Sequence, residues 1–214
     1  MKAKIFMMCL LCGLIANAQS FKDTFDTNSL EWTECAYESN SGTAIIDNGL
    51  MIIKSKGLSK GVGLLMKANG DDPSQFNTFF ETHCYAPLDV AKPFKITSRV
   101  VIEELGEDRI VGLAFNYKDD GNFYSFTFNK NMVSFTRYKD GHVVGRIQQS
   151  VKWADKSKVA QEWDLTSIDG VLTFIVDGMP IIKVRYMPLE YSGFGFYTYG
   201  KQTLKVDEVE FIQL

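Results

Sequence analysis

Helical periodicity, long runs of one charge and linker-like stretches are all missing from this 214-residue chain. It holds 5 prolines and 17 glycines, without a collagen-like period, and 45% of its residues are hydrophobic. Disordered chains have too few apolar residues to offset the entropy of ordering, so the composition excludes that class. No Lys/Arg-rich run offers the phosphate neutralisation that dominates nucleic-acid binding, and the net charge is −3. We therefore expect one globular domain that does not bind nucleic acid.

Familiar catalytic and metal-binding motifs are absent as well. There is no Gly-x-Ser-x-Gly elbow, no P-loop and no Gly-x-Gly-x-x-Gly segment. His83 and His142 are the only histidines, and their separation is not a metal-ligand spacing. Oxygen atoms of the 119–122 turn could bind Ca²⁺, although an ordinary hairpin turn explains the same residues. We expect no metal site and no cofactor, with calcium the one candidate.

Residues 1–18 have the pattern of a secretory signal peptide. Lys2 and Lys4 precede an uncharged apolar run over 5–15, and residues 16–18 read Ala-Asn-Ala, a small-x-small cleavage site. An apolar run of this length is too short to cross a bilayer. We expect a mature domain of residues 19–214 without a transmembrane segment, either secreted or periplasmic.

Two cysteines, Cys35 and Cys84, follow the expected cleavage site. An oxidising compartment permits a disulfide between them, but sequence separation does not show whether their Cα atoms approach closely enough. A Cys35–Cys84 disulfide and two separate thiols are both compatible with the sequence.

Short β-rich runs separated by turn residues fill the rest of the chain. Asx-Gly pairs, which favour two-residue hairpin turns, occur within 47–49, 119–121, 139–141, 168–170 and 176–178. The strands expected around these turns are too many for one open twisted sheet, so we predict an all-β fold, a two-sheet antiparallel β-sandwich. The predicted strands are 43–47, 50–55, 77–84, 94–103, 110–117, 122–129, 132–138, 142–148, 161–167, 171–177, 181–186, 193–199 and 204–212.

Period-two alternation separates a bulky face from a small, polar face in strands 110–117, 122–129 and 132–138. The bulky face is expected in the core and includes Val111, Leu113, Phe115, Tyr117, Tyr124, Phe126, Phe128, Val133 and Phe135. The opposite face is either solvated or forms the floor of a ligand site, and it includes Gly112, Ala114, Asn116, Ser125 and Thr127.

Four segments resemble the concanavalin A-like lectin/glucanase superfamily, whose fold is a jelly roll of two antiparallel sheets. They are Phe21-Lys22-Asp23-Thr24-Phe25 followed by Trp32; the hairpin over 117–126; the strand–turn–strand unit from Trp163 to the Asp-Gly pair at 177–178; and the closing strands over 193–198 and 206–209. The resemblance implies a jelly roll. Members of the superfamily include lectins, laminin G-like modules, glycoside hydrolases and polysaccharide lyases, so the fold alone does not fix the function.

The laminarinase-type hydrolases of this superfamily use a Glu-x-Asp-x-x-Glu strand, and no such motif occurs here. We therefore expect a secreted carbohydrate-binding, lectin-like protein rather than an enzyme, with a polysaccharide or other glycan as its partner. One alternative is a glycoside hydrolase or polysaccharide lyase acting on extracellular polysaccharide. The other is a laminin G-like adhesion module with a protein partner.

Sugar binding needs aromatic rings for the apolar sugar face and planar polar groups for the hydroxyls. Such side chains are expected on the small, polar face and its flanks, and an ordinary solvated sheet face is the alternative explanation. The expected ligand-binding residues are Glu81, His83, Arg99, Asn116, Arg137, Tyr138, Tyr197 and Tyr199. No catalytic residue is assigned.

Overall fold

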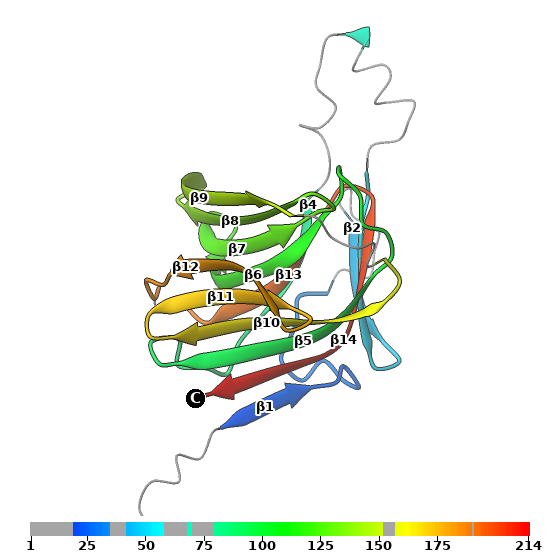
Figure 1. The fold of residues 1–214 in the computed structure, drawn as a ribbon. Helices are drawn as coiled ribbons and strands as arrows, with labels where there is room; N and C mark the ends of the chain where they lie inside the picture. The colour runs from blue at the N-terminus through cyan, green and yellow to red at the C-terminus, as the bar shows by residue number, and fades with distance from the viewer. Residues whose placement is uncertain (1–18, 35–41, 58–67, 70–78, 152–156, 190) are drawn as a thin grey trace, which may run out of the picture.

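The computed structural model describes residues 19–34, 42–57, 68–69, 79–151, 157–189 and 191–214. Its strands form two antiparallel sheets that stack face to face (Figure 1). Sheet A has the order β12-β11-β10-β5-β14-β3-β2, with β1 also beside β14. Sheet B has the order β4-β13-β6-β7-β8-β9. The predicted all-β, two-sheet antiparallel sandwich is confirmed.

The strand bounds agree with the predicted ranges within a few residues, apart from β1, which is additional. Sheet A contains β1 (Ser20–Asp23), β2 (Gly42–Asp47), β3 (Leu50–Ser55), β5 (Phe94–Ile102), β10 (Ala160–Ile168), β11 (Val171–Val176), β12 (Met179–Arg185) and β14 (Gln202–Gln213). Sheet B contains β4 (Phe79–Tyr85), β6 (Ile110–Asp119), β7 (Asn122–Phe128), β8 (Met132–Lys139), β9 (His142–Ser150) and β13 (Gly193–Tyr199).

The Asx-Gly pairs form the hairpin turns expected of them. Positive φ angles occur at both turn residues of Asn48-Gly49, Asp140-Gly141, Asp169-Gly170 and Asp177-Gly178. Two positive φ angles define the turn whose twist matches that of the strands it joins. The turn between β6 and β7 differs, because Asp119 Oδ1 there accepts hydrogen bonds from the Gly121 N–H and the Asn122 amide, each at 2.9 Å. The Asp119 carboxylate thus stabilises the turn through these two hydrogen bonds.

Aromatic side chains fill the space between the sheets. Phe126 of β7 lies with its ring centroid 5.9 Å from that of Phe174 on β11, and Phe128 packs edge-on against Trp163 of β10 at 5.2 Å. These residues are almost fully buried, as the alternation of their strands predicts. Burial of apolar area at this density is the main favourable contribution to folding.

Strand β6 departs from simple alternation at Asn116. Its φ is +50°, and the register of β6 with β7 and with β13 shifts beside it. The shift turns Asn116 toward the interior, fully buried, where its side-chain amide donates to the Tyr186 hydroxyl at 3.2 Å. Tyr117 is turned to the outer face of sheet B, where it packs with Ala114 and Phe123. The expectations that Asn116 faces outward and Tyr117 faces the core are therefore wrong, because a bulge exchanges the two faces.

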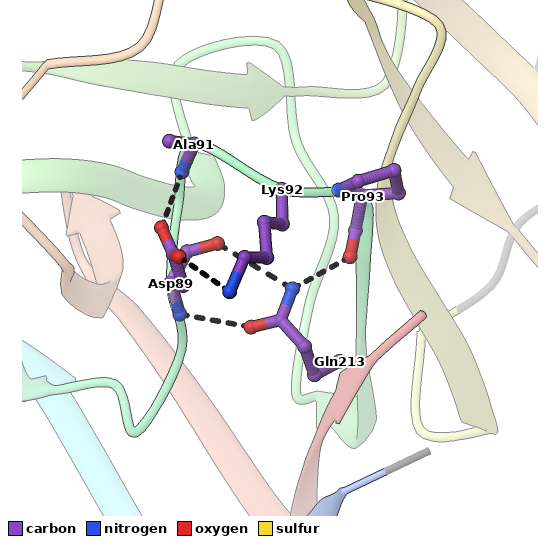
Figure 2. Close-up of polar contacts among 5 residues, drawn as sticks. All are labelled: Asp89, Ala91, Lys92, Pro93 and Gln213. Carbon is purple, nitrogen blue, oxygen red and sulfur yellow. Dashed lines mark hydrogen bonds and ion pairs between the residues drawn. The ribbon is translucent and has the colours of Figure 1, made fainter. Parts of the chain in front are cut away.

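The loop between β4 and β5 is fixed by the last strand of the chain (Figure 2). Gln213 accepts a hydrogen bond from the Asp89 N–H at 2.9 Å and donates to the Pro93 carbonyl at 2.7 Å. Asp89 also pairs with Lys92 at 3.0 Å. Because the loop carries the chain from sheet B to sheet A, these contacts hold the two layers together at this end.

Cys84 of β4 faces the core, is buried, and forms no disulfide with any residue that the structure describes. Burial, followed by the negative charge of Asp23, raises the pKa of this thiol well above its usual range. Cys35 lies outside the described residues, so the expected choice between a disulfide and two thiols stays a prediction.

Replacing Tyr186 by Phe should reduce the free energy of unfolding by about 1–2 kcal/mol. The Tyr186 hydroxyl donates to the Val90 carbonyl at 3.1 Å and accepts from the Asn116 side-chain amide at 3.2 Å, so its loss leaves a buried acceptor and a buried donor without a partner. Urea unfolding would measure the change. Tyr85→Phe is the matched control, since Tyr85 is 73% exposed and should give no change. Equal stability of the two variants would contradict the role given to the Tyr186 hydroxyl.

Candidate functional site

The centre of the outer face of sheet B is made of small side chains. Strand register places Gly195, Ala114, Ser125 and Thr136 in one row across the sheet, and Gly112, Thr127 and Ser134 in the next. We call these seven residues the sheet B floor. Three of its members carry hydroxyls and are nonetheless buried: Ser125, Thr127 and Thr136. Because adjacent strands lie about 4.8 Å apart, four strands give the floor a width of roughly 15 Å.

A row of four rings borders the floor at the end nearest the 119–122 turn. His83 and Tyr117 lie with ring centroids 4.2 Å apart, and Tyr117 and Phe123 lie 5.8 Å apart. Tyr138 stacks on Phe123 at 4.5 Å, with 15° between the ring planes. We call His83, Tyr117, Phe123 and Tyr138 the ring row. It runs across β4, β6, β7 and β8, and Tyr138 and His83 are its half-exposed members.

Two glycines on β13 make room for the first contact of the ring row. Strand β13 lies between β4 and β6, with Gly195 opposite both His83 and Ala114, and Gly193 opposite Tyr117. A Cβ atom on Gly195 would lie 2.9 Å from the His83 Cβ and 2.2 Å from the Thr82 carbonyl oxygen. One on Gly193 would lie 2.1 Å from the Tyr117 carbonyl oxygen. The absence of side chains there allows the His83 and Tyr117 rings to meet over the intervening strand.

Tyrosines and polar side chains border the other sides of the floor. Tyr197 of β13 lies opposite Gly112, and Tyr199 lies two residues further along the same face. Both tyrosines are half-buried and lie on the outer face of β13, whereas Phe194 and Phe196 lie on its inner face in the core. On the far side, β9 places Arg146 beside Thr136 and Gln148 beside Ser134. Gln148 donates to the Ser134 hydroxyl at 3.2 Å.

His83 is the ring-row residue whose charge depends on pH near neutrality. Burial lowers the pKa of the His83 imidazole from its usual value of 6.5, and the negative charge of Asp120 partly opposes this. His83 Nε2 lies 3.4 Å from the Thr33 hydroxyl, whereas Nδ1 is buried and has no hydrogen-bond partner among the described residues. Asp120 itself accepts a short hydrogen bond of 2.5 Å from the Tyr117 hydroxyl. The neutral imidazole therefore fits this environment better than the cation.

Of the ligand-binding residues expected from the sequence, the structure brings His83, Tyr138, Tyr197 and Tyr199 to the border of the floor. Glu81 occupies the β4 position opposite Tyr197, and its side chain lies outside the described part of the chain.

The other three expected residues lie elsewhere. Arg99 is on β5 of sheet A, where it pairs with Asp207 at 3.4 Å, so it is on the opposite side of the molecule from the floor. Asn116 points inward, as described above. Arg137 shares the inner face of β8 with Phe135, and its guanidinium lies 5.7 Å from the ring centre of Tyr124.

Sequence reasoning missed several residues that border the floor, namely Tyr117, Phe123, Arg146 and Gln148. Phe123 alternates with the core residues Tyr124 and Phe126, so the period-two pattern of β7 could have placed it on the outer face. Arg146 and Gln148 also alternate along β9 and could have been found from the same pattern that identified Thr127. Nothing in local sequence marks the change of face at Tyr117.

A pocket of about 300 Å³ lies at the end of the sandwich away from the ring row, next to the connection between β13 and β14. It is lined by Lys54, Ser55, Glu103, Glu104, Arg109, Lys201, Gln202 and Thr203. Its acidic groups are already paired, Glu104 with Arg109 and Glu103 with Lys205, the latter at 2.8 Å. Among the described residues, no group of three or more His, Cys, Asp or Glu side chains could hold a metal ion. Nor does that part of the chain contain a helix with the length and apolarity needed to cross a bilayer.

No protein-family model and no curated protein matches the chain. Solved structures do match it. The β-glucanase of Bacillus licheniformis superposes with a TM-score of 0.59 at 11% identity, covering 90% of this chain and 97% of that one. The Emp47p carbohydrate recognition domain gives 0.59 at 11% identity, covering 91% and 94%. The laminarinase catalytic domain from Thermotoga petrophila gives 0.57 at 11% identity, covering 92% and 98%.

These neighbours are concanavalin A-like lectin and glycoside hydrolase domains, in agreement with the resemblance found in the sequence. The chain therefore has the concanavalin A-like jelly-roll fold.

Replacing Gly195 by Ala should destabilise the protein by about 1–3 kcal/mol, the usual cost of forcing an extra group into a packed site. The new Cβ would collide with the Thr82 carbonyl and with His83. Gly145→Ala on β9 is the control, because its Cβ would meet nothing closer than the Arg137 Cβ at 3.9 Å. Thermal and urea unfolding of both variants would measure the difference. If Gly195→Ala were as stable as Gly145→Ala, the close approach over β13 would not exist.

Acidification should destabilise the protein through His83. Its pKa is lower when folded than when unfolded, so between the two values the unfolded chain binds more protons. Stability is then complete above about pH 6.5 and falls as the pH decreases below it. Urea unfolding at about pH 7.5 and 5 should show a larger loss for the native sequence than for His83→Gln. His142→Gln, at the exposed start of β9, should behave like the native sequence. Parallel pH dependence of the native protein and His83→Gln would refute this assignment.

Proposed function

We propose that this protein is a lectin-like carbohydrate-binding protein whose ligand lies on the sheet B floor. The observation that carries the proposal is the arrangement of the floor: small hydroxyl-bearing side chains at its centre, aromatic rings on two sides, and Arg146 with Gln148 on a third. Rings such as Tyr138 and Tyr197 suit the apolar face of a sugar. Hydroxyl, amide and guanidinium groups suit its hydroxyls.

The outer face of sheet A has a different chemistry, and this contrast supports the choice of sheet B. Ion pairs cover sheet A, including Lys22 with Glu208 at 2.7 Å and Lys95 with Asp164 at 3.1 Å. Thr97 adds a hydrogen bond to Asp164 at 2.7 Å. These polar groups are satisfied by one another and are therefore less available to a ligand than the hydroxyls of the sheet B floor. The sheet B floor carries small side chains and few charges.

The names of similar structures also support a carbohydrate ligand. They include a carbohydrate recognition domain, a β-glucanase, and carbohydrate-binding module CBM66 from Bacillus subtilis, the last with a TM-score of 0.51 at 13% identity over 83% of this chain and 94% of that one. Their low identity limits the argument to the fold, so the proposal depends on the floor of this chain.

The expected site of action is outside the cytoplasm. The basic start, apolar run and small-x-small site in residues 1–18 support removal of a signal peptide and a secreted or periplasmic location. The proposed binding mode requires neither a metal ion nor a cofactor, because the floor supplies hydroxyls and its border supplies an amide and aromatic rings directly.

Replacing Tyr197 by Ala should weaken glycan binding by about 1–3 kcal/mol, or roughly 5- to 150-fold in Kd. The reason is loss of one aromatic border of the floor. A glycan array with residues 19–214 would identify the strongest ligand, and calorimetry with that glycan would then measure the Kd of each variant.

Phe21→Ala is the control, because it removes an exposed ring from β1 of sheet A, away from the floor. Its Kd should equal that of the native sequence, and thermal unfolding should show both variants folded. Equal Kd values for Tyr197→Ala and the native protein would show that the ligand does not bind on the floor. A reducing-sugar and unsaturated-product assay on the same glycans completes the test: turnover would favour the hydrolase or lyase alternative. Absence of both binding and turnover would favour an adhesion module.

A further inference from the structure

The pocket beside the β13–β14 connection is fixed by hydrogen bonds from two buried side chains. The Ser55 hydroxyl, at the end of β3, donates to the Gly200 carbonyl at 2.6 Å. The Gln202 amide, at the start of β14, donates to the Glu104 carbonyl, also at 2.6 Å. These bonds hold the segments that wall the pocket, so its shape exists before a ligand binds. Its volume of about 300 Å³ is at the small end of the range for ligand sites.

Positive charge predominates in this pocket, although the net charge of the chain is −3. The lining has three basic side chains, Lys54, Arg109 and Lys201, and two carboxylates. One of these carboxylates, Glu103, is paired at 2.8 Å with Lys205, which lies outside the lining. Lys54 and Lys201 form no ion pair with any acidic side chain that the structure describes. The pocket therefore has positive charge that an anionic ligand would offset.

The Arg109 guanidinium already binds one carboxylate, that of Glu104. Arg109 is the fixed partner of this pair. Its side chain is only 23% exposed and packs beside Gly106, where a Cβ atom would lie 3.3 Å from Arg109 Cδ. The Glu104 side chain is 67% exposed, so its carboxylate can leave the pocket for solvent. Because exposed ion pairs add little to stability, another carboxylate can replace Glu104 on the guanidinium at small cost.

We propose that this pocket is a second ligand site, which binds the carboxylate of a sugar acid by exchange with Glu104 on Arg109. The planar guanidinium fork suits a carboxylate, and the charges of Lys54 and Lys201 stabilise it. A carboxylate is the ligand class because the group that occupies the guanidinium is itself a carboxylate. All eight residues that line the pocket are polar or charged, which favours a ligand rich in hydroxyls over an apolar acid.

The pocket adjoins the sheet B floor along the chain. Tyr199 pairs with Ile110 at the border of the floor, and Arg109 directly precedes Ile110. Lys201 follows Tyr199 by two residues, so their Cα atoms are at most about 7 Å apart. Two sources can therefore supply the carboxylate. One is a free sugar acid; the other, if the proposed function holds, is a uronic acid unit of a polymer that continues over the floor.

Titration of residues 19–214 with sodium galacturonate, followed by NMR, should move the backbone amide signals of Glu104 and Lys201 to saturation. Galactose has the same ring without the carboxylate and should not move them. Arg109→Gln should weaken galacturonate binding about tenfold or more, because it removes hydrogen bonds to a charged group. Lys201→Gln should weaken it about 2- to 5-fold. Lys183→Gln, an equal change on β12 of sheet A, is the control and should leave the Kd unchanged.

Glu104→Gln gives the sharpest test, because it should bind galacturonate about 2- to 5-fold more tightly than the native sequence. The substitution removes the charge that competes with the ligand for Arg109. Asp169→Asn removes an equal charge from the β10–β11 turn and should leave the Kd unchanged. A Glu104–Arg109 pair with only a structural role would give no gain in affinity. An unchanged or weaker Kd for Glu104→Gln would overturn the proposal, as would equal binding of galactose and galacturonate.

Tetragalacturonate separates the two sources of the carboxylate. Binding that is tighter than that of galacturonate, and that Tyr197→Ala weakens, would support a polymer that reaches the pocket from the floor. Equal Kd values for the two ligands would support a free sugar acid in the same pocket. The amide signals of Glu104 and Lys201 report on the pocket directly. A floor that binds no glycan would therefore refute the proposed function and leave the carboxylate site intact.

Discussion

The face of sheet B that could receive a ligand depends on one backbone turn, the positive φ of Asn116. Asparagine tolerates this left-handed region better than most residues, which allows β6 to bulge without a glycine. The inward Asn116 side chain is held by the Tyr186 hydroxyl, and Tyr186 in turn packs against Phe115 at 6.1 Å. Tyr117 is thereby placed outside, where it joins His83 and Phe123. A core contact thus determines the position of a ring on the outer face of sheet B.

The chemistry of the two faces of sheet B follows from packing. The inner face must fill the space against sheet A, and Phe126, Phe174 and their neighbours do so. No sheet among the described strands packs on the outer face, so the residues opposite this core can be Gly112, Ala114 and Ser125. Larger rings remain on the outer face only along its borders. Those nearest the 119–122 turn support one another, as Tyr138 and Phe123 do, and Asp120 fixes the Tyr117 hydroxyl.

Sequence alone was sufficient for the sheets and for most faces, because strand alternation and Asx-Gly turns are local properties. It placed Gly112, Ala114, Ser125 and Thr127 together correctly, and Phe126 and Phe128 in the core. Alternation shows which residues share a strand face but not which sheet receives the strand. Arg99 follows β4 closely in the chain, yet β5 crosses to sheet A and takes the guanidinium to the other side. The bulge at Asn116 was hidden because its cause, Tyr186, lies 70 residues away.

The scarcity of charged groups on the floor has a consequence for how it would hold a polymer. Arg146 is the one strongly charged side chain placed beside the floor by the described register, and rings and hydroxyls bind sugars with modest free energy per site. A repeating glycan offers many equivalent positions to one floor, so a polymer that leaves the floor at one sugar can bind again at the next. The apparent affinity for the polymer then exceeds the affinity for one sugar without any new kind of contact. Weak contacts to each sugar are therefore compatible with a protein that recognises a repetitive ligand.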